Sequence, residues 1–316
     1  MVSTKKFTAT IVLIFVLFCS ADAQIEIFDK NSIEKIKNGT TYVVVNDPES
    51  IYMAEYLNVF RHYWTIPKDV QFLKESDIKS KATPGDSFIS FATLTITSSY
   101  GATSIEHFLY LWVPEKSYFK KHRDPKTGDM DGIAKIEVSG DAAMIRQTYF
   151  GRRTGTDSVD INGPHVLNCY PGMLKTYLQR LGALLKTGKK INYYDEITDN
   201  GQLKELPGQT LYCNTADFDK ATMFSAGNNS DKIGKIFEDY KFPYQLLNDK
   251  ELSDKILSEN KPFYFLLFVR AGAGKLICVI NSLTGDVIYL RRHSMSYNLK
   301  SGDLKSLYKD ISKAAK

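Results

Sequence analysis

Three segments come close to catalytic or phosphate-binding motifs, and each lacks residues that the chemistry requires. A serine hydrolase of the α/β type needs a G-x-S-x-G turn, but residues 223–227 read Met-Phe-Ser-Ala-Gly, without the first glycine. A phosphate loop around Gly274-Lys275 needs a glycine where Val269 stands and Ser or Thr where Leu276 stands. The five histidines never show the H-E-x-x-H spacing of zinc hydrolases. The sequence therefore argues against these three chemistries.

An acidic loop offers carboxylate oxygens that could bind calcium. It contains Asp124, Asp129 and Asp131, with Gly128 and Gly132 beside them. The loop lacks the ligand spacing and the bidentate glutamate of an EF-hand, and Asp and Gly are common in exposed turns. We therefore expect no bound metal and no cofactor.

Polar residues also follow several predicted strands, where open α/β sheets usually bind ligands. These positions are unexplained by core packing, although Asn and Asp also cap helices. The candidate ligand-binding residues are Asn46 and Asp47 in the first half of the chain, and Asn214, Thr215, Asn248, Asp249 and Arg270 in the second.

Alternating strand and helix patterns position these residues, and the same order of elements occurs twice. In the first half, a predicted strand at 39–45, rich in β-branched residues, precedes a helix with an apolar face formed by Met53, Leu57, Phe60 and Trp64. Further strands are predicted at 70–73, 88–97 and 107–113, with a short helix at 76–81 between the first two. In the second half, strands are predicted at 208–213, 244–247, 263–269, 275–280 and 287–290, with helices near 233–240 and from Asn248.

An internal duplication accounts for this order. Pairing Thr41 with Thr210, Phe60 with Phe237, Gln71 with Gln245 and Phe88 with Phe263 gives offsets of 169 to 177 residues. The predicted fold is α/β, with two tandem related β-α-β-α-β-β units. Each unit has a mostly parallel, Rossmann-like sheet with an antiparallel hairpin strand.

A helical connector is predicted between the two units. Its clearest element is a helix over 171–187 that begins at Pro171, ends at Gly188 and has one leucine-rich face. A strand at 135–138 and a helix at 141–150 precede it. The predicted divisions are 1–23 signal peptide, 24–130 first unit, 131–205 connector and 206–316 second unit.

The first residues indicate export. Lys5 and Lys6 precede an apolar run of nine residues over 11–19, and Ala21-Asp22-Ala23 matches a signal peptidase site. Nine residues are too few to span a bilayer. We predict cleavage before Gln24 and a periplasmic or extracellular product without a transmembrane segment. Lipidation at Cys19 is the less favoured alternative, because bulky Phe18 precedes it.

Charge and cysteine content limit the partners further. Cleavage removes two lysines and one aspartate, so the formal charge falls from +5 to +4, without a dense basic cluster. Nucleic acid is therefore not an expected partner. Cys169, Cys213 and Cys278 remain, which allows one disulfide with a spare thiol, or three buried thiols.

Tandem α/β units behind a signal peptide are similar to the general plan of periplasmic solute-binding proteins, whose ligands lie in a cleft between lobes. The likeness concerns architecture alone and identifies no family. The sequence favours a non-enzymatic exported protein that binds a small ligand or a protein partner, or has a structural role. The alternatives are a hydrolase or transferase using Asp47 or His62 with Arg152 or Arg153, and an interaction module with an exposed strand edge.

Overall fold

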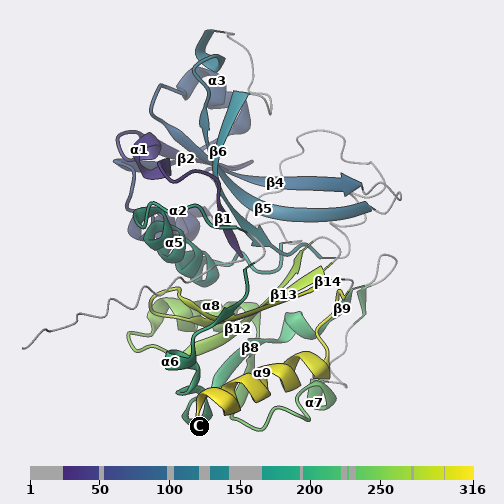
Figure 1. Ribbon diagram of the computed structural model, residues 1–316. Coiled ribbons are helices and arrows are strands. Elements are labelled where there is room, and N and C mark those ends of the chain that lie inside the picture. Colours follow the sequence, from purple (N-terminus) through teal and green to yellow (C-terminus); the bar gives the residue numbers. More distant parts are fainter. Residues whose placement is uncertain are drawn as a thin grey trace, which may run out of the picture.

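Two mixed six-stranded sheets, stacked with helices between them, form most of the protein (Figure 1). The computed structural model describes residues 24–49, 53–97, 103–120, 129–141, 166–192, 195–221, 226–227, 233–271, 274–294 and 296–316. The predicted signal peptide, the predicted helix after residue 141 and Arg152 and Arg153 lie outside these ranges.

The first sheet has the strand order β1-β6-β5-β4-β2-β3. Its strands are β1 (Ile25–Ile27), β2 (Thr40–Val44), β3 (Asp69–Leu73), β4 (Ser87–Thr97), β5 (Thr103–Pro114) and β6 (Met130–Val138). The accompanying helices are α1 (Ser32–Ile36), α2 (Met53–Tyr63), α3 (Ile78–Lys81) and α5 (Pro171–Lys186).

The second sheet has the order β11-β8-β12-β13-β14-β7. Its strands are β7 (Ile197–Thr198), β8 (Leu211–Asn214), β11 (Tyr244–Leu247), β12 (Tyr264–Ala271), β13 (Gly274–Asn281) and β14 (Val287–Ser294). Its helices are α6 (Asn200–Leu203), α7 (Ile233–Ile236), α8 (Asp249–Ser258) and α9 (Ser301–Ala314). The short strands β9 (Lys220–Ala221) and β10 (Ala226–Gly227) form a separate pair.

The two sheets have the same topology, as the predicted duplication requires. In each, three parallel strands (β3-β2-β4 and β11-β8-β12) continue into three antiparallel ones (β5-β6-β1 and β13-β14-β7). Both sheets also have a β-bulge in the same ladder, between Leu111 and Trp112 of β5 and between Val279 and Ile280 of β13. A bulge is a specific local feature, so its recurrence supports two related units.

The strand ladders refine the predicted alignment of the two units. Gln71 and Gln245 occupy equivalent positions, as predicted. Thr41, however, corresponds to Leu211, and Phe88 corresponds to Phe265, because these residues hold the same positions in their ladders. The predicted pairs were one or two residues out of register, since similarity of residue type does not fix strand register.

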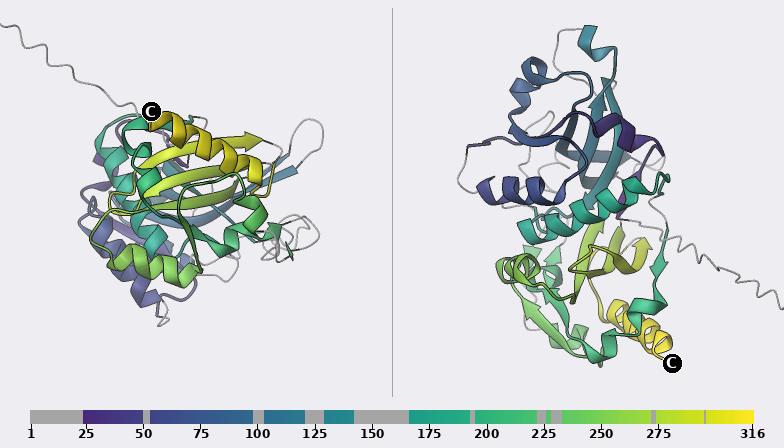
Figure 2. Two further views of the ribbon diagram at one scale, coloured as in Figure 1. Left: turned by 90° about the horizontal axis from the view of Figure 1, so that it is seen from below. Right: turned by 90° about the vertical axis from the view of Figure 1, so that its left-hand side faces the viewer.

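Helix α5 lies between the two sheets and is buried on almost every side. Leu174, Tyr177, Leu178, Leu181 and Leu185, the predicted apolar face, are all buried, and so is Lys175. One hydrophobic cluster runs from the first sheet through α2 and α5 to α8 and the inner face of the second sheet. Figure 2 shows this layer of helices between the sheets, with α9 covering the outer face of the second sheet. The two units therefore share one hydrophobic core, unlike the two lobes separated by a cleft in solute-binding proteins.

The segment predicted as a connector, 131–205, contains β6 and α5. Strand β6 pairs with β5 along its length, and α5 follows it as α9 follows β14 in the second unit. The two helices differ in exposure: α5 is buried on both sides, whereas Lys305, Lys309 and Lys313 of α9 are exposed. Helix α9 thus ends the stack with a polar surface.

The contact face of α2 differs from the predicted one. Met53, Phe60 and Trp64 are buried as expected, but Tyr56 and Val59 are buried while Leu57 is only half-buried. The helix contacts both α5 and β3, so its buried side is rotated relative to the spacing read from the sequence.

Two glycines of α5 allow a test of how tightly the units are packed. A Cβ at Gly172 would lie 2.5 Å from the carbonyl oxygen of Ser253 in α8, whereas a Cβ at Gly182 has no neighbour within 4 Å. We expect Gly172→Ala to lower the free energy of unfolding by about 1 to 3 kcal/mol through overpacking. Gly182→Ala, the control, is expected to raise it by up to about 1 kcal/mol. Urea denaturation measures both, and equal effects would contradict the tight crossing of α5 and α8.

Candidate functional site

The candidate site lies where β8 ends and β12 continues past it. Strand β8 pairs with β12 only from Tyr264 to Leu266. Beyond that point the edge of β12 meets the first unit, where the backbone N–H of Arg270 donates to Oγ of Ser139 at 2.7 Å. Ser139 directly follows β6. The carboxyl ends of strands from both units therefore meet at this junction.

Arg270 places a buried guanidinium at this junction, with 3% of the residue exposed. One of its terminal nitrogens donates to the carbonyl oxygen of Asp219 at 2.7 Å, and the group lies 5.0 Å from the centre of the Phe268 ring. Burial lowers its pKa, while Asp217 and Tyr297 favour the charged form. Its Nε is buried without a hydrogen-bond partner among the described residues.

Asp217 is the second buried ionisable group of the site. It lies in the 3-10 turn Thr215–Phe218 and is 6% exposed. Burial raises the pKa of its carboxyl well above 3.8, against the opposing effect of Arg270, and Asp249 raises it further. Burial therefore favours the neutral form of this carboxyl, which is able to donate a hydrogen bond. Its Oδ2 also has no partner within the described part of the chain.

Asn214 and Asp249, two of the predicted site residues, belong to a hydrogen-bonded chain beside Asp217. Asn214 donates its amide to Asp249 and accepts from the backbone of Ala216 at 3.0 Å. Asp249 also accepts from the hydroxyl of Tyr170 at 2.6 Å. This chain connects β8, α8 and the start of α5, so it holds the two units together at the edge of the site.

The remaining predicted residues have separate positions. Asn248 caps α8 in a capping box with Glu251, with reciprocal bonds of 2.9 Å. Thr215 is half-buried in the turn that contains Asp217. Asn46 and Asp47 are exposed after β2 in the first sheet. The structure thus brings Asn214, Asp249 and Arg270 together around Asp217 and places the others outside that group.

The predicted site residues did not include Asp217, Asp219, Ser139 or Tyr297. The signal for two of them was present, because Asp217 and Asp219 follow Asn214 in the same segment after β8. Ser139 comes from the other unit, about 130 residues from Arg270 in sequence, and only the packing of the units brings it there.

Other groups with catalytic potential are held in unreactive environments. Burial raises the pKa of Cys169 to about 12, and it raises the pKa of Cys213 well above its usual range. All three cysteines are free, buried thiols. Burial also lowers the pKa of His107 to about 4. His62 is exposed on α2, where its ring contacts Tyr63 edge-on.

Two of the residues that came near to known motifs have structural roles, whereas Asp124 and residues 223–225 lie outside the described ranges. Lys275, the lysine of the incomplete phosphate loop, is buried, binds Asp303 of α9 and donates to the carbonyl of Asn298 at 2.8 Å. Asp131 pairs with Lys35 at 2.6 Å. Among the described residues, no group of three His, Cys, Asp or Glu is placed to hold a metal ion.

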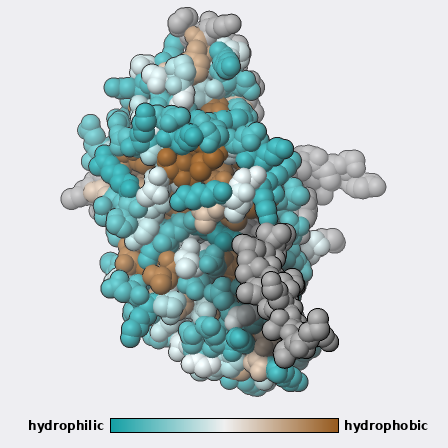
Figure 3. All heavy atoms as spheres, turned by 60° about the vertical axis from the view of Figure 1, so that its left-hand side comes forward, coloured by the Kyte–Doolittle hydropathy of each residue, from teal (hydrophilic) through white to brown (hydrophobic). Residues whose placement is uncertain are grey.

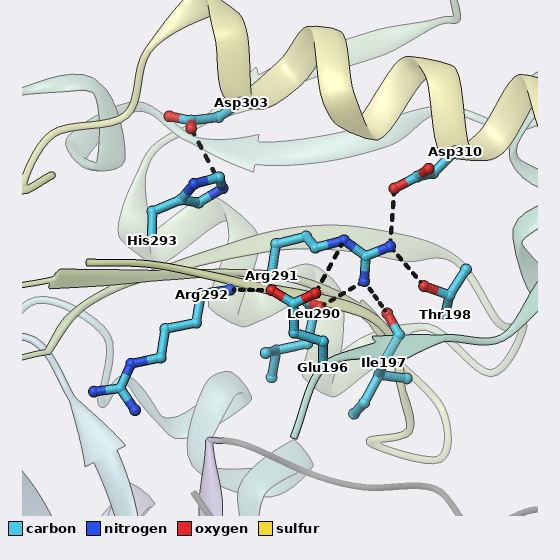
Figure 4. A network of polar contacts seen from close by, with 9 residues as sticks. All are labelled: Glu196, Ile197, Thr198, Leu290, Arg291, Arg292, His293, Asp303 and Asp310. Carbon is cyan, nitrogen blue, oxygen red and sulfur yellow. Dashed lines mark hydrogen bonds and ion pairs between the residues drawn. The ribbon is translucent and has the colours of Figure 1, made fainter. Parts of the chain in front are cut away.

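A separate polar network fastens β14 to its neighbours. Arg291 donates to the carbonyl of Ile197 and the hydroxyl of Thr198 in β7, and to Asp310 of α9 at 3.0 Å (Figure 4). The guanidinium of Arg291 is thus bonded to β7 and α9 at once. The network therefore holds α9 against the second sheet. Arg292, the next residue, points away from the network in Figure 4.

The surface face in Figure 3 and the cavity beneath α5 differ in how polar and apolar side chains are distributed. On the face shown in Figure 3, polar side chains predominate and apolar ones reach the surface in small areas. A small cavity beneath α5 is lined by apolar side chains such as Leu109 and Leu178. No helix within the described ranges is both long and apolar enough to cross a bilayer.

Comparisons with protein-family models, curated proteins and solved structures found no match to this chain.

The raised pKa of Asp217 predicts that the stability of the protein depends on pH. A carboxyl whose pKa is raised on folding contributes stability that is complete below its unfolded value near 3.8 and is lost as the pH rises. Asp217→Asn removes this titration. We expect the variant to exceed wild type in unfolding free energy by about 1 kcal/mol or more at pH 8, with a much smaller difference at pH 4.

Urea denaturation between pH 4 and pH 8 measures this difference. Asp254→Asn is the control, because Asp254 is an exposed residue of α8 paired with Lys250. A pH-independent loss of stability in Asp217→Asn would show that the buried carboxyl is ionised.

Proposed function

We propose that this protein is an exported, non-enzymatic binding protein whose ligand site is the junction around Arg270 and Asp217. The observation that carries the proposal is the pair of buried polar atoms, Nε of Arg270 and Oδ2 of Asp217, without partners among the described residues. Buried polar groups in proteins are nearly always hydrogen-bonded, so a ligand that supplies the missing bonds would be favoured there.

The chemistry of the two side chains indicates the kind of ligand. A guanidinium donates to carboxylate or phosphate oxygens, and a protonated carboxyl can donate a further hydrogen bond. Both groups therefore suit a ligand with an anionic oxygen. The position after the strand ends of β8 and β12 is the usual one for ligands of α/β sheets.

The non-enzymatic part of the proposal is supported by the state of the reactive groups. Burial raises the pKa of Cys169 and of Cys213 and lowers that of His107, so these groups are not prepared as nucleophile or base near neutral pH. Export is supported by the signal-peptide pattern before Gln24.

A thermal-shift screen tests the proposed function. The mature protein would be screened against carboxylates, phosphates, sugars, peptides and metal ions. We expect an anionic ligand near a hundred times its Kd to raise the melting temperature by about 5 °C or more. Arg270→Met is expected to abolish this shift, because it removes the guanidinium.

Arg180→Met is the matched control, since Arg180 is also buried at the unit interface but pairs with Asp286 at 2.6 Å, away from the site. It is expected to keep the ligand-induced shift. A ligand that stabilises wild type and Arg270→Met equally binds elsewhere and contradicts the assignment of the site.

A further inference from the structure

A cluster of carboxylates lies on β1, β5 and β6 of the first sheet, near the end of β6 that precedes Ser139. Nζ of Lys135 lies 3.1 Å from Glu137, 3.4 Å from Glu26 and 3.7 Å from Glu106. Three carboxylates thus share one ammonium group. Arg292 of β14 also attracts Glu137, which leaves the cluster one positive charge short when all three glutamates are ionised.

Glu137 is the most deeply buried carboxylate of this cluster. It is fully buried, and its Oε2 has no hydrogen-bond partner among the described residues. Burial raises the pKa of Glu137 to about 7, and Glu106 raises it too, while Lys135 and Arg292 oppose the shift. A buried carboxylate of this kind is costly unless another cation approaches.

The residue opposite Glu137 is Gln24, the first residue after the predicted cleavage site. The backbone N–H of Glu137 donates to the carbonyl of Gln24 at 2.9 Å, and the side-chain amide of Gln24 donates to the carbonyl of Glu137 at 3.2 Å. Gln24 is 1% exposed. In the precursor its backbone nitrogen is a neutral amide, whereas cleavage before Gln24 converts it into an ammonium group.

We infer that cleavage before Gln24 completes the charge cluster: the new α-ammonium group of Gln24 becomes the ionic partner of Glu137. This inference rests on the proposed export, because it requires the mature chain to begin at that residue. Processing then strengthens the β1–β6 edge of the first sheet, and an N-terminal extension leaves Glu137 undercompensated.

Four purified proteins test the inference at pH 7. They are the mature chain beginning at Gln24 and the same chain with five Gly and Ser residues in front, each with and without Glu137→Gln. Five residues can move the ammonium group by as much as about 17 Å, beyond the screening length of about 8 Å at physiological salt. Intact mass verifies each N-terminus.

We expect opposite effects of Glu137→Gln in the two backgrounds. It should lower the melting temperature of the mature chain, because it removes an ion pair, and raise that of the extended chain, because it removes a poorly paired buried carboxylate. Each change should be about 2 °C or more. Equal effects of Glu137→Gln in both backgrounds would overturn the inference.

Analysis of the N-terminus of the exported protein separates the two proposals. If the first residue is not Gln24, the proposed cleavage fails, while the four-protein comparison still reports on the ion pair. If the mature chain has lost one ammonia, the α-nitrogen of Gln24 has formed a bond to Cδ of the same residue. The side-chain amide nitrogen has then left as ammonia. The resulting lactam has no charge, so that outcome overturns the inference even where cleavage is as proposed.

Discussion

The burial of α5 on both sides is the constraint on which the rest of the structure depends. A helix that is apolar over one side only can cover one sheet, and the other sheet must then find a different partner. Helix α5 instead covers the first sheet and the inner face of the second, within one continuous hydrophobic cluster. Polar contacts fix its orientation, among them Arg180 with Asp286 and the amide of Gly172 with Ser253. The two units therefore behave as one packed body, and Ser139 reaches Arg270 as a consequence.

The two units share a topology but have diverged in their polar residues. In the equivalent ladders, Arg270 faces Lys275 in the second unit, whereas Thr93 faces His107 in the first. The charged pair and the acidic segment after β8 therefore belong to the second unit only. A duplicated scaffold supplies the strand ends in both units, and substitutions in one of them supply the candidate binding chemistry.

Several buried or half-buried charged groups of this protein differ in how fully they are paired. Lys275 with Asp303, and Arg291 with its acceptors on β7 and α9, are provided with partners and hold α9 on the second sheet. Asp217, Arg270 and Glu137 retain polar atoms without partners among the described residues. Since an unpaired buried polar atom is costly, the second group marks places where a bound ligand or a new terminus would stabilise the protein.

Local patterns in the sequence were sufficient to determine most of the elements and their repetition. The longer strands, the start of α5 at Pro171 and its leucine-rich face follow from periodicity and helix-capping rules, which depend on neighbouring residues. The short strands β1, β7, β9 and β10 were not predicted. The residues of the candidate site could be predicted only in part, because in the sequence Asn248 and Arg270 are both simply polar residues near strand ends. Tertiary structure made Asn248 a helix cap and buried Arg270 beside Asp217. It also decided the register of the repeat, the double-sided burial of α5 and the approach of Ser139, because each depends on contacts between residues far apart in the chain.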